Sequence, residues 1–188
     1  MFGNASSVHA EGRRARALID EARAAVAALV NAEPGEVVFT SGATESNTWA
    51  LSAPWERIAL AGIEHDSVRA PALQMAARRG ARVIDIPVTR DGIANLDGLD
   101  LDAATLIVLQ RANNETGVLQ DVEAAGLIAT EHGARLHTDA VQAPGRIAVD
   151  FKTLGAATMS LSAHKIGGPK GVGALVIGNG VTLDPLLA

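Results

Sequence analysis

The sequence contains no cysteine, which excludes a disulfide framework, a thiolate metal site and a cysteine nucleophile within this chain. It also lacks a strong charge of either sign: the net charge is -5, so electrostatics give no reason to expect a nucleic acid or an anionic membrane as partner. No apolar run approaches the roughly 18–20 residues that span a bilayer. The N-terminus lacks the basic and apolar regions of a secretory signal. We therefore expect a cytoplasmic protein.

The remaining composition is that of an ordinary globular protein. The chain has 188 residues, of which 48% are hydrophobic and 20% charged. This length suits one domain and is sufficient for a sizeable core. The sequence shows no internal repeat, low-complexity tract or interdomain linker, so we expect a single domain over residues 1–188.

Short β-rich runs alternate with helical patterns along the chain. This alternation predicts an α/β fold with a mostly parallel sheet of about seven strands and helices on both faces. The segment Ile166–Gly171 is too short and glycine-rich for a helix, so the last two strands are expected to be antiparallel. The predicted strands are Val37–Thr40, Arg57–Gly62, Ala81–Val88, Thr105–Gln110, Ala134–Asp139, Thr158–Ser162 and Val172–Ile177. The predicted helices are Glu11–Asn31, Ala43–Leu51, Asp66–Arg79 and Val122–His132.

The first predicted helix has apolar residues at helical spacing, among them Leu18, Ile19, Val26 and Leu29. This spacing predicts one apolar face, with charged side chains mostly on the other.

Polar residues follow five of the predicted strands at their carboxyl ends, where open α/β sheets bind ligands. The groups are Ser41–Ser46, Glu64-His65, Asn113–Gly117, His137–Asp139 with Gln142, and Ser162–Lys165. This recurrence predicts a binding site along one edge of the sheet.

The segment Ser41–Thr44 places glycine and small residues between a strand and a helix. Free N–H groups at a helix N-terminus, with hydroxyls beside them, can bind a phosphate. The same pattern is also typical of a plain helix cap. A Walker A motif and a Gly-x-Gly-x-x-Gly motif are both absent from the sequence.

Asp139 ends an apolar run and is expected to be buried. A buried carboxylate needs a cationic or hydrogen-bonding partner, which either a nearby arginine or a ligand cation could supply. His137 and Asp139 could belong to a metal site, but no third ligand has suitable spacing, and we predict none. His65, taken alone, could be a structural histidine.

Lys165 lies after a predicted strand, beside His164 and before a glycine-rich turn. A lysine at the floor of a cleft can acquire a lowered pKa and form a Schiff base. A phosphate cradle, a buried acid, a histidine and such a lysine together indicate pyridoxal 5'-phosphate as cofactor.

The chain resembles the cysteine desulfurases of the class V aminotransferase group. The motifs that carry the resemblance span nearly the whole chain in the family's order. They are Gly3–His9, SGATESN at 41–47, Glu64-His65, NNETG at 113–117, His137–Gln142 and SLSAHKIGGPKGVG at 160–173. The resemblance implies the large domain of fold-type I pyridoxal-phosphate enzymes.

The resemblance also implies roles for individual residues. Lys165 would bind the cofactor covalently, and His65 would stack on its ring and assist proton transfer. Asp139 would pair with the ring nitrogen, and Gln142 would hydrogen-bond the ring oxygen. Asn114 would lie near the substrate carboxylate and the ring oxygen. The phosphate would be bound by Ala43, Thr44, Ser162 and His164.

In the family, an N-terminal arm precedes the position of Gly3 and a small domain follows that of Pro185. The small domain carries the sulfur-accepting cysteine and a substrate-binding arginine, which therefore have no counterpart here. We expect the cofactor domain of a homodimeric enzyme that converts L-cysteine to L-alanine and passes sulfur to an acceptor or scaffold protein. The alternatives are a selenocysteine lyase or other β-eliminating relative, a split enzyme, and a non-catalytic dimerisation module.

Overall fold

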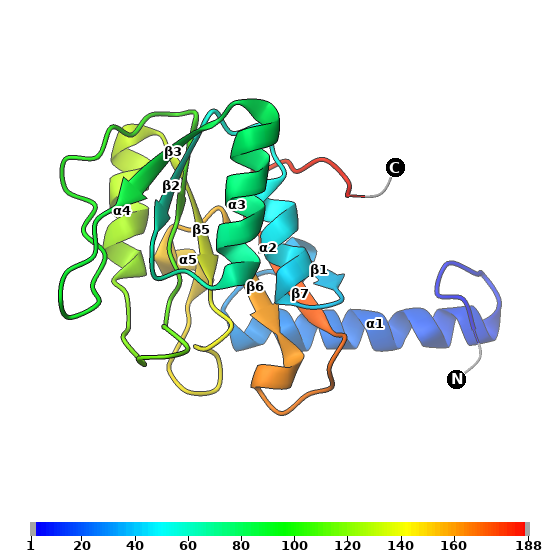
Figure 1. Cartoon of the computed structure of the whole chain (residues 1–188). Helices are drawn as coiled ribbons and strands as arrows, with labels where there is room; N and C mark the ends of the chain where they lie inside the picture. The colour runs from blue at the N-terminus through cyan, green and yellow to red at the C-terminus, as the bar shows by residue number, and fades with distance from the viewer. Residues whose placement is uncertain (1–2, 187–188) are drawn as a thin grey trace.

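The computed structural model describes residues 3–186 and has a central sheet with helices on both sides (Figure 1). Among these residues, no helix combines the length and apolarity needed to cross a bilayer. The helices are α1 (Ala10–Leu29), α2 (Ala43–Leu51), α3 (Asp66–Arg79), α4 (Val122–His132) and α5 (Phe151–Leu154), with 3-10 turns η1 (Pro34–Glu36) and η2 (Ala163–Lys165). The strands are β1 (Val37–Thr40), β2 (Arg57–Ala61), β3 (Arg82–Ile86), β4 (Thr105–Val108), β5 (Arg135–Asp139), β6 (Thr158–Ser162) and β7 (Gly173–Ile177).

Within residues 3–186, the sheet contains seven strands in the order β1-β7-β6-β5-β4-β2-β3. The pairs β3–β2, β2–β4, β4–β5 and β5–β6 are parallel. Strand β7 is antiparallel to both β6 and β1. The predicted fold class is therefore confirmed, including the antiparallel pairing of the last two strands. Because β7 alone is reversed, β1, β2, β4, β5 and β6 all end at the same edge of the sheet.

Helices cover both faces of the sheet, as the alternation of strands and helices predicted. Successive residues of a strand point to opposite faces. In β2 and β4, Ile58, Leu60 and Leu106 pack with α2 and α3, whereas Ala59 and Ile107 belong to the core shared with α1, α4 and α5. Figure 1 shows α2 and α3 together on one side of the strands.

Helix α1 differs from the sequence prediction in how it packs. It begins and ends within two residues of the predicted bounds, but its expected apolar face is largely exposed: Leu18 is 51% and Leu29 42% exposed. Only the C-terminal end, with Ala27 and Val30, is buried in the core. Figure 1 shows the reason, because α1 extends well beyond the sheet.

The other elements agree closely with the prediction. Helices α2, α3 and α4 have the predicted bounds. Strands β2 to β5 and β7 are one to three residues shorter than predicted, because their terminal residues already belong to loops. The short helix α5, capped by Asp150, was not predicted.

Candidate functional site

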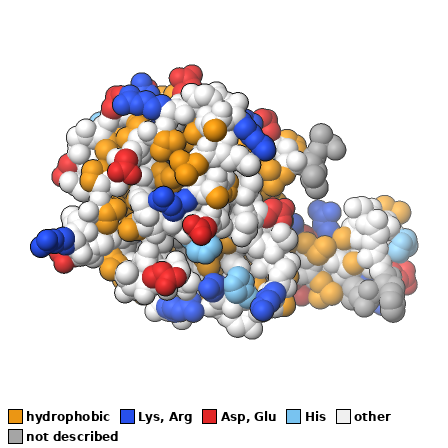
Figure 2. All heavy atoms as spheres, in the orientation of Figure 1, with side chains coloured by type: hydrophobic (Ala, Val, Ile, Leu, Met, Phe, Trp, Pro, Cys, Tyr) orange, Lys and Arg blue, Asp and Glu red, His pale blue; other side chains and the backbone are white. Residues whose placement is uncertain are grey.

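A cavity of about 470 Å³ lies at the sheet edge where the parallel strands end. Figure 2 shows histidine, acidic and basic side chains gathered on the lower central part of this face. The lining residues are Ser41, Gly42, Ala43, Thr44, Glu45, His65, Ser67, Gln110, Ala112, Asn114, Asp139, Val141, Gln142, Ser162, His164, Lys165, Lys170 and Gly171.

Every residue predicted for the site lines this one cavity. These are Ala43, Thr44, His65, Asn114, Asp139, Gln142, Ser162, His164 and Lys165. They come from the ends of β1, β2, β4, β5 and β6, so the topology brings together residues up to 122 positions apart, from Ala43 to Lys165.

The N-terminus of α2 faces the cavity without a side-chain cap. Gly42 is the N-cap residue and no side chain accepts from the first turn. Ser41 instead donates from its backbone N–H to Glu45 Oε2 at 2.7 Å. Hydrogen bonds from the Ser41 hydroxyl and N–H lower the pKa of Glu45. The N–H groups of the first turn therefore remain able to bind an anion, as the phosphate interpretation requires.

Glycine at position 173 permits the close packing that places this turn. A Cβ on Gly173 would lie 2.5 Å from Gly42 Cα and 2.8 Å from the Leu161 carbonyl oxygen. The first turn of α2 can thus approach the end of β6, where Ser162 Oγ lies 2.8 Å from His164 Nδ1. The two predicted phosphate-binding segments meet because β7 contributes no side chain between them.

Asp139 is buried at the floor of the cavity, with 8% of its surface exposed. Its Oδ2 accepts from Asn47 Nδ2 at 2.8 Å and its Oδ1 accepts from the Val141 N–H at 3.0 Å. Burial raises the pKa of Asp139, and these two donors oppose the rise. Among residues 3–186, no lysine or arginine forms an ion pair with it. Of the two partners considered above, the arginine is therefore excluded within this part of the chain.

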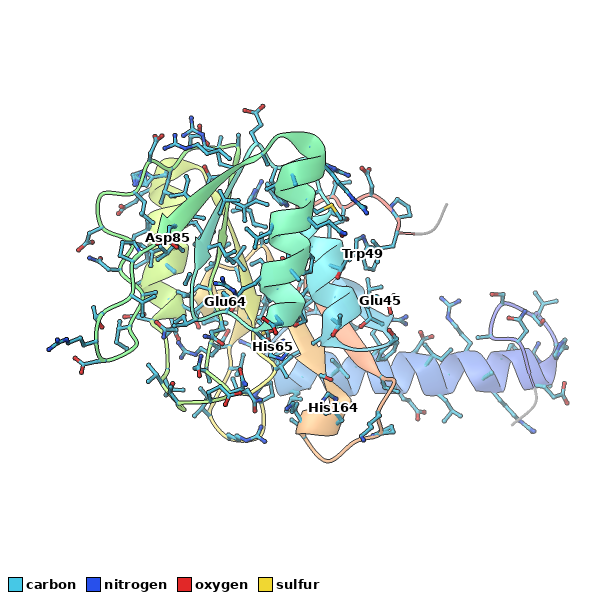
Figure 3. All side chains as sticks on the ribbon, viewed as in Figure 1. Glu45, Trp49, Glu64, His65, Asp85 and His164 are labelled. Carbon is cyan, nitrogen blue, oxygen red and sulfur yellow. The ribbon has the colours of Figure 1, made fainter. Side chains whose placement is uncertain are left out.

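His65 is the N-cap of α3, and its ring lines the cavity. Its Nδ1 accepts from the Ser67 N–H at 3.0 Å and lies 2.8 Å from Ser67 Oγ. Because Nδ1 acts as an acceptor, the proton of the neutral ring is on Nε2. Figure 3 shows His65 and Glu64 near the lower end of α3, with His164 below them.

Glu64 is buried directly behind His65, and only 5% of its surface is exposed. Its Oε1 accepts from the Gln110 N–H at 2.7 Å, while Oε2 has no hydrogen-bond partner in the described structure. Burial raises the pKa of Glu64 well above its ordinary value. The hydrogen bond from Gln110 to Glu64 ties the loop after β2 to the end of β4.

Two lysines, Lys165 and Lys170, line the cavity. Lys165 ends the 3-10 turn η2 that follows β6 and is close enough to Asp139 to lower its pKa electrostatically. Lys170 lies in the exposed glycine-rich loop before β7. Asn114 is exposed at the opposite rim and donates to Glu115 Oε1 at 2.6 Å.

Several buried polar residues behind the cavity received no role from the sequence. Asn47 and His137 lie within recognised motifs, yet only the structure connects them to Asp139. Ser67, which is partly exposed and lines the cavity itself, also received no role and contacts His65. Asn47, His137 and Ser67 each lie in an element that contains other polar residues, so no local signal in the sequence sets them apart. Within residues 3–186, no cluster of three or more His, Cys, Asp or Glu side chains could hold a metal ion.

Comparison with known sequences gives a match over nearly the whole chain. The family pattern described as aminotransferase class V matches residues 1–187. A cysteine desulfurase IscS of Dictyoglomus turgidum is 39% identical over 99% of this chain, which covers 50% of that relative. An IscS-like cysteine desulfurase of Mycobacterium tuberculosis is 36% identical over 99% of this chain and 51% of that relative. The chain thus spans about half the length of the curated relatives it matches.

Solved structures give the same result. A NifS-like protein superposes with a TM-score of 0.93 at 35% identity, over 98% of this chain and 54% of that structure. A structure described as SspA in complex with cysteine superposes with a TM-score of 0.92 at 32% identity, over 99% of this chain and 57% of that one.

Proposed function

The chain belongs to the class V aminotransferase family, and from this membership we propose that its cavity binds pyridoxal 5'-phosphate and serves a cysteine desulfurase. The observation that carries the proposal is the buried Asp139, which lines the cavity without a cationic partner in the described structure. A buried carboxylate is stabilised by an opposite charge. The protonated ring nitrogen of pyridoxal phosphate would supply that charge.

The donor set at the other end of the cavity also fits the cofactor. The uncapped first turn of α2, at Ala43 and Thr44, and the side chains of Ser162 and His164 all line the cavity. N–H groups and hydroxyls are the donors that bind a phosphate group. Gln142 and Asn114 would contact the ring oxygen, and Lys165 would attach the cofactor through its Nζ.

When bound, pyridoxal phosphate withdraws electrons from the α-carbon of an amino acid. The protein's own residues would prepare this chemistry. Asp139 would keep the ring nitrogen protonated, and His65 would lie against the ring and hold a proton on Nε2. Lys165 would bind the cofactor and, once released, exchange a proton with the substrate.

We propose L-cysteine as substrate and L-alanine as product, with the C–S bond broken and the sulfur taken up by a thiol as a persulfide. The curated relatives named above are cysteine desulfurases, and one similar structure holds cysteine. Because this chain has no cysteine, the accepting thiol must lie outside these 188 residues. The homodimer, the sulfur acceptor or scaffold protein and the cytoplasmic location belong to the same proposal.

The test uses the three lysines of the chain, Lys152, Lys165 and Lys170. Purified chain is mixed with pyridoxal phosphate, reduced with borohydride to make the lysine–cofactor bond permanent, and analysed by peptide mass spectrometry. We expect the modification on Lys165, and visible absorption that Lys165→Ala abolishes. Lys152→Ala is the matched control, because Lys152 is paired with Glu33 away from the cavity. Equal labelling of all three lysines would contradict the proposal.

The absence of cysteine favours one second candidate, a lyase that releases the reduced chalcogen without an enzyme thiol. The two reactions differ in product. With L-cysteine and a stoichiometric protein thiol, a desulfurase forms persulfide, whereas a β-eliminating lyase releases free sulfide. With selenocysteine and a small dithiol added as the two-electron reductant, a lyase releases selenide and alanine.

A further inference from the structure

A chain of hydrogen bonds runs behind the cavity from β6 to Asp139. Thr158 Oγ1 lies 2.8 Å from His137 Nδ1, and His137 Nε2 lies 3.0 Å from Asn47 Oδ1. Asn47 Nδ2 then donates to Asp139 Oδ2 at 2.8 Å. Asn47 and His137 are fully buried and Thr158 is 2% exposed. None of these three residues lines the cavity, so they can act on a ligand only through Asp139 or another lining residue.

The direction of every bond in this chain follows from Asp139. An ionised carboxylate only accepts, so the Asn47 amide must present its NH₂ group to Asp139 and its oxygen to His137. His137 must then carry its proton on Nε2 and accept from the Thr158 hydroxyl at Nδ1. Burial lowers the pKa of His137 to about 4, so at neutral pH the ring has the single proton that this arrangement requires.

The second hydrogen of the Asn47 amide extends the network to His65. Asn47 Nδ2 lies 3.0 Å from Ser67 Oγ, and that hydroxyl lies 2.8 Å from His65 Nδ1. The Asn47 amide therefore contacts Asp139, which would face the ring nitrogen. It also contacts Ser67, which supports the His65 ring that would stack on the cofactor.

We infer that Asn47 is a positioning residue, fixed by His137, that holds the Asp139 carboxylate in its orientation toward the cofactor ring. This inference rests on the proposed function, because it concerns how the proposed cofactor is bound. Each Asp139 oxygen accepts one bond from the protein and can accept another. The network thus leaves acceptor capacity for a ligand while fixing the plane of the carboxylate.

Three other titratable groups near Asp139 also influence its charge. They are Glu64 behind His65, and His65 and Lys165 at the cavity. Removal of the Asn47 donor would disfavour the charged form of Asp139, because burial already opposes that charge. The ring nitrogen would then be less readily protonated and the cofactor bound less tightly.

The test compares variants of the full 188-residue chain by two readouts: the Kd for pyridoxal phosphate, and the pH midpoint at which the visible absorption of the bound cofactor changes. For Asn47→Leu we expect Kd to rise about tenfold and the pH midpoint to move. His137→Phe should produce a smaller change of the same sign. His137→Gln should behave like the unchanged chain, because glutamine can donate to Asn47 and accept from Thr158.

The double variant separates positioning from general packing. Because His137 acts through Asn47, adding His137→Phe to Asn47→Leu should change neither readout further, whereas independent effects would add. Thr105→Val is the control for lost stability, since Thr105 is buried but bonds to Asp102 at the opposite edge of the sheet. If Asn47→Leu does not fold, Asn47→Ala, which removes the donor without adding a charge, takes its place with the same expectation.

The outcomes are distinguishable. If the unchanged chain does not bind pyridoxal phosphate, the proposed function and this inference both fail. If it binds, and the Asn47 variants match Thr105→Val in both readouts or the effects in the double variant add, the proposed function stands and the positioning role is overturned.

Discussion

Asn47 Nδ2 lies 2.8 Å from Asp139 Oδ2, although 92 positions separate the two residues in the chain. The contact joins α2, which follows the first strand, to the carboxyl end of β5 in the middle of the sheet. The helix that presents its N-terminus to the cavity therefore also supports the acid at its floor.

The buried Glu64 should make the stability of the protein depend on pH. Because its pKa is raised above the ordinary value of 4.5 by burial, the folded state retains a proton that the unfolded state releases. The contribution is fully present below pH 4.5 and is lost as pH rises through the raised pKa, at up to about 1.4 kcal/mol per pH unit. Glu64→Gln should remove this loss, so that its unfolding free energy relative to the unchanged chain increases with pH. Urea unfolding of both proteins at several pH values measures this difference in free energy. If the two plots of unfolding free energy against pH are parallel, the prediction is wrong.

His137 should have the opposite pH dependence. Its pKa falls from 6.5 to about 4 on burial, so the unfolded state takes up a proton first on acidification. The free energy of unfolding should decrease between pH 6.5 and about 4, at up to about 1.4 kcal/mol per pH unit. In His137→Gln this part of the decrease should be missing. Unfolding of the cofactor-free chain measures both proteins; equal slopes would exclude a buried neutral histidine.

Gly173 should tolerate no side chain. Gly173→Ala would place a Cβ against the backbone of Gly42 and Leu161, and we expect a loss of about 1–3 kcal/mol of stability together with weaker binding of pyridoxal phosphate. Gly35→Ala is the matched control, because nothing lies within 4 Å of a Cβ there and its effect should stay below about 0.5 kcal/mol. Thermal unfolding and a cofactor titration compare the two; equal effects would show that the close approach is unimportant.

The ends of α1 should differ in their contribution to stability. Val30, the fully buried C-cap of α1, packs in the core, so Val30→Ala should cost about 1–3 kcal/mol. Leu18 is 51% exposed on the projecting part, and Leu18→Ala should change stability by less than about 0.5 kcal/mol. Chemical unfolding distinguishes the two, and a larger loss from Leu18→Ala would reveal a contact that the described chain lacks.

Strands β2 and β4 could be predicted from the sequence because both are apolar runs after their first residue, as expected for strands covered on both faces. Leu106 and Ile107 point to different cores, and no polar residue interrupts such a run. The cavity residues were also predictable, since the carboxyl ends of parallel strands meet at one edge whatever the order of strands.

The sequence did not predict contacts between residues that lie far apart along the chain. Nothing local shows that Asn47 faces Asp139, or that the orphaned Oε2 of Glu64 lies behind His65. Amphipathic spacing likewise predicts that α1 is a helix but not how far the sheet extends beneath it, so the exposure of Leu18 was missed.

The pairing of β1 has a consequence for the order in which the protein is assembled during synthesis. Among the described strands, β1 pairs with β7 alone, so Val37–Thr40 cannot join the sheet until residues 173–177 have been translated. Until β7 is made, the turn after β1 that would bind the cofactor phosphate is held only through α2, which packs with α3. On a ribosome, this side of the cavity would be completed only when β7 is inserted, and binding of the proposed cofactor would report that insertion.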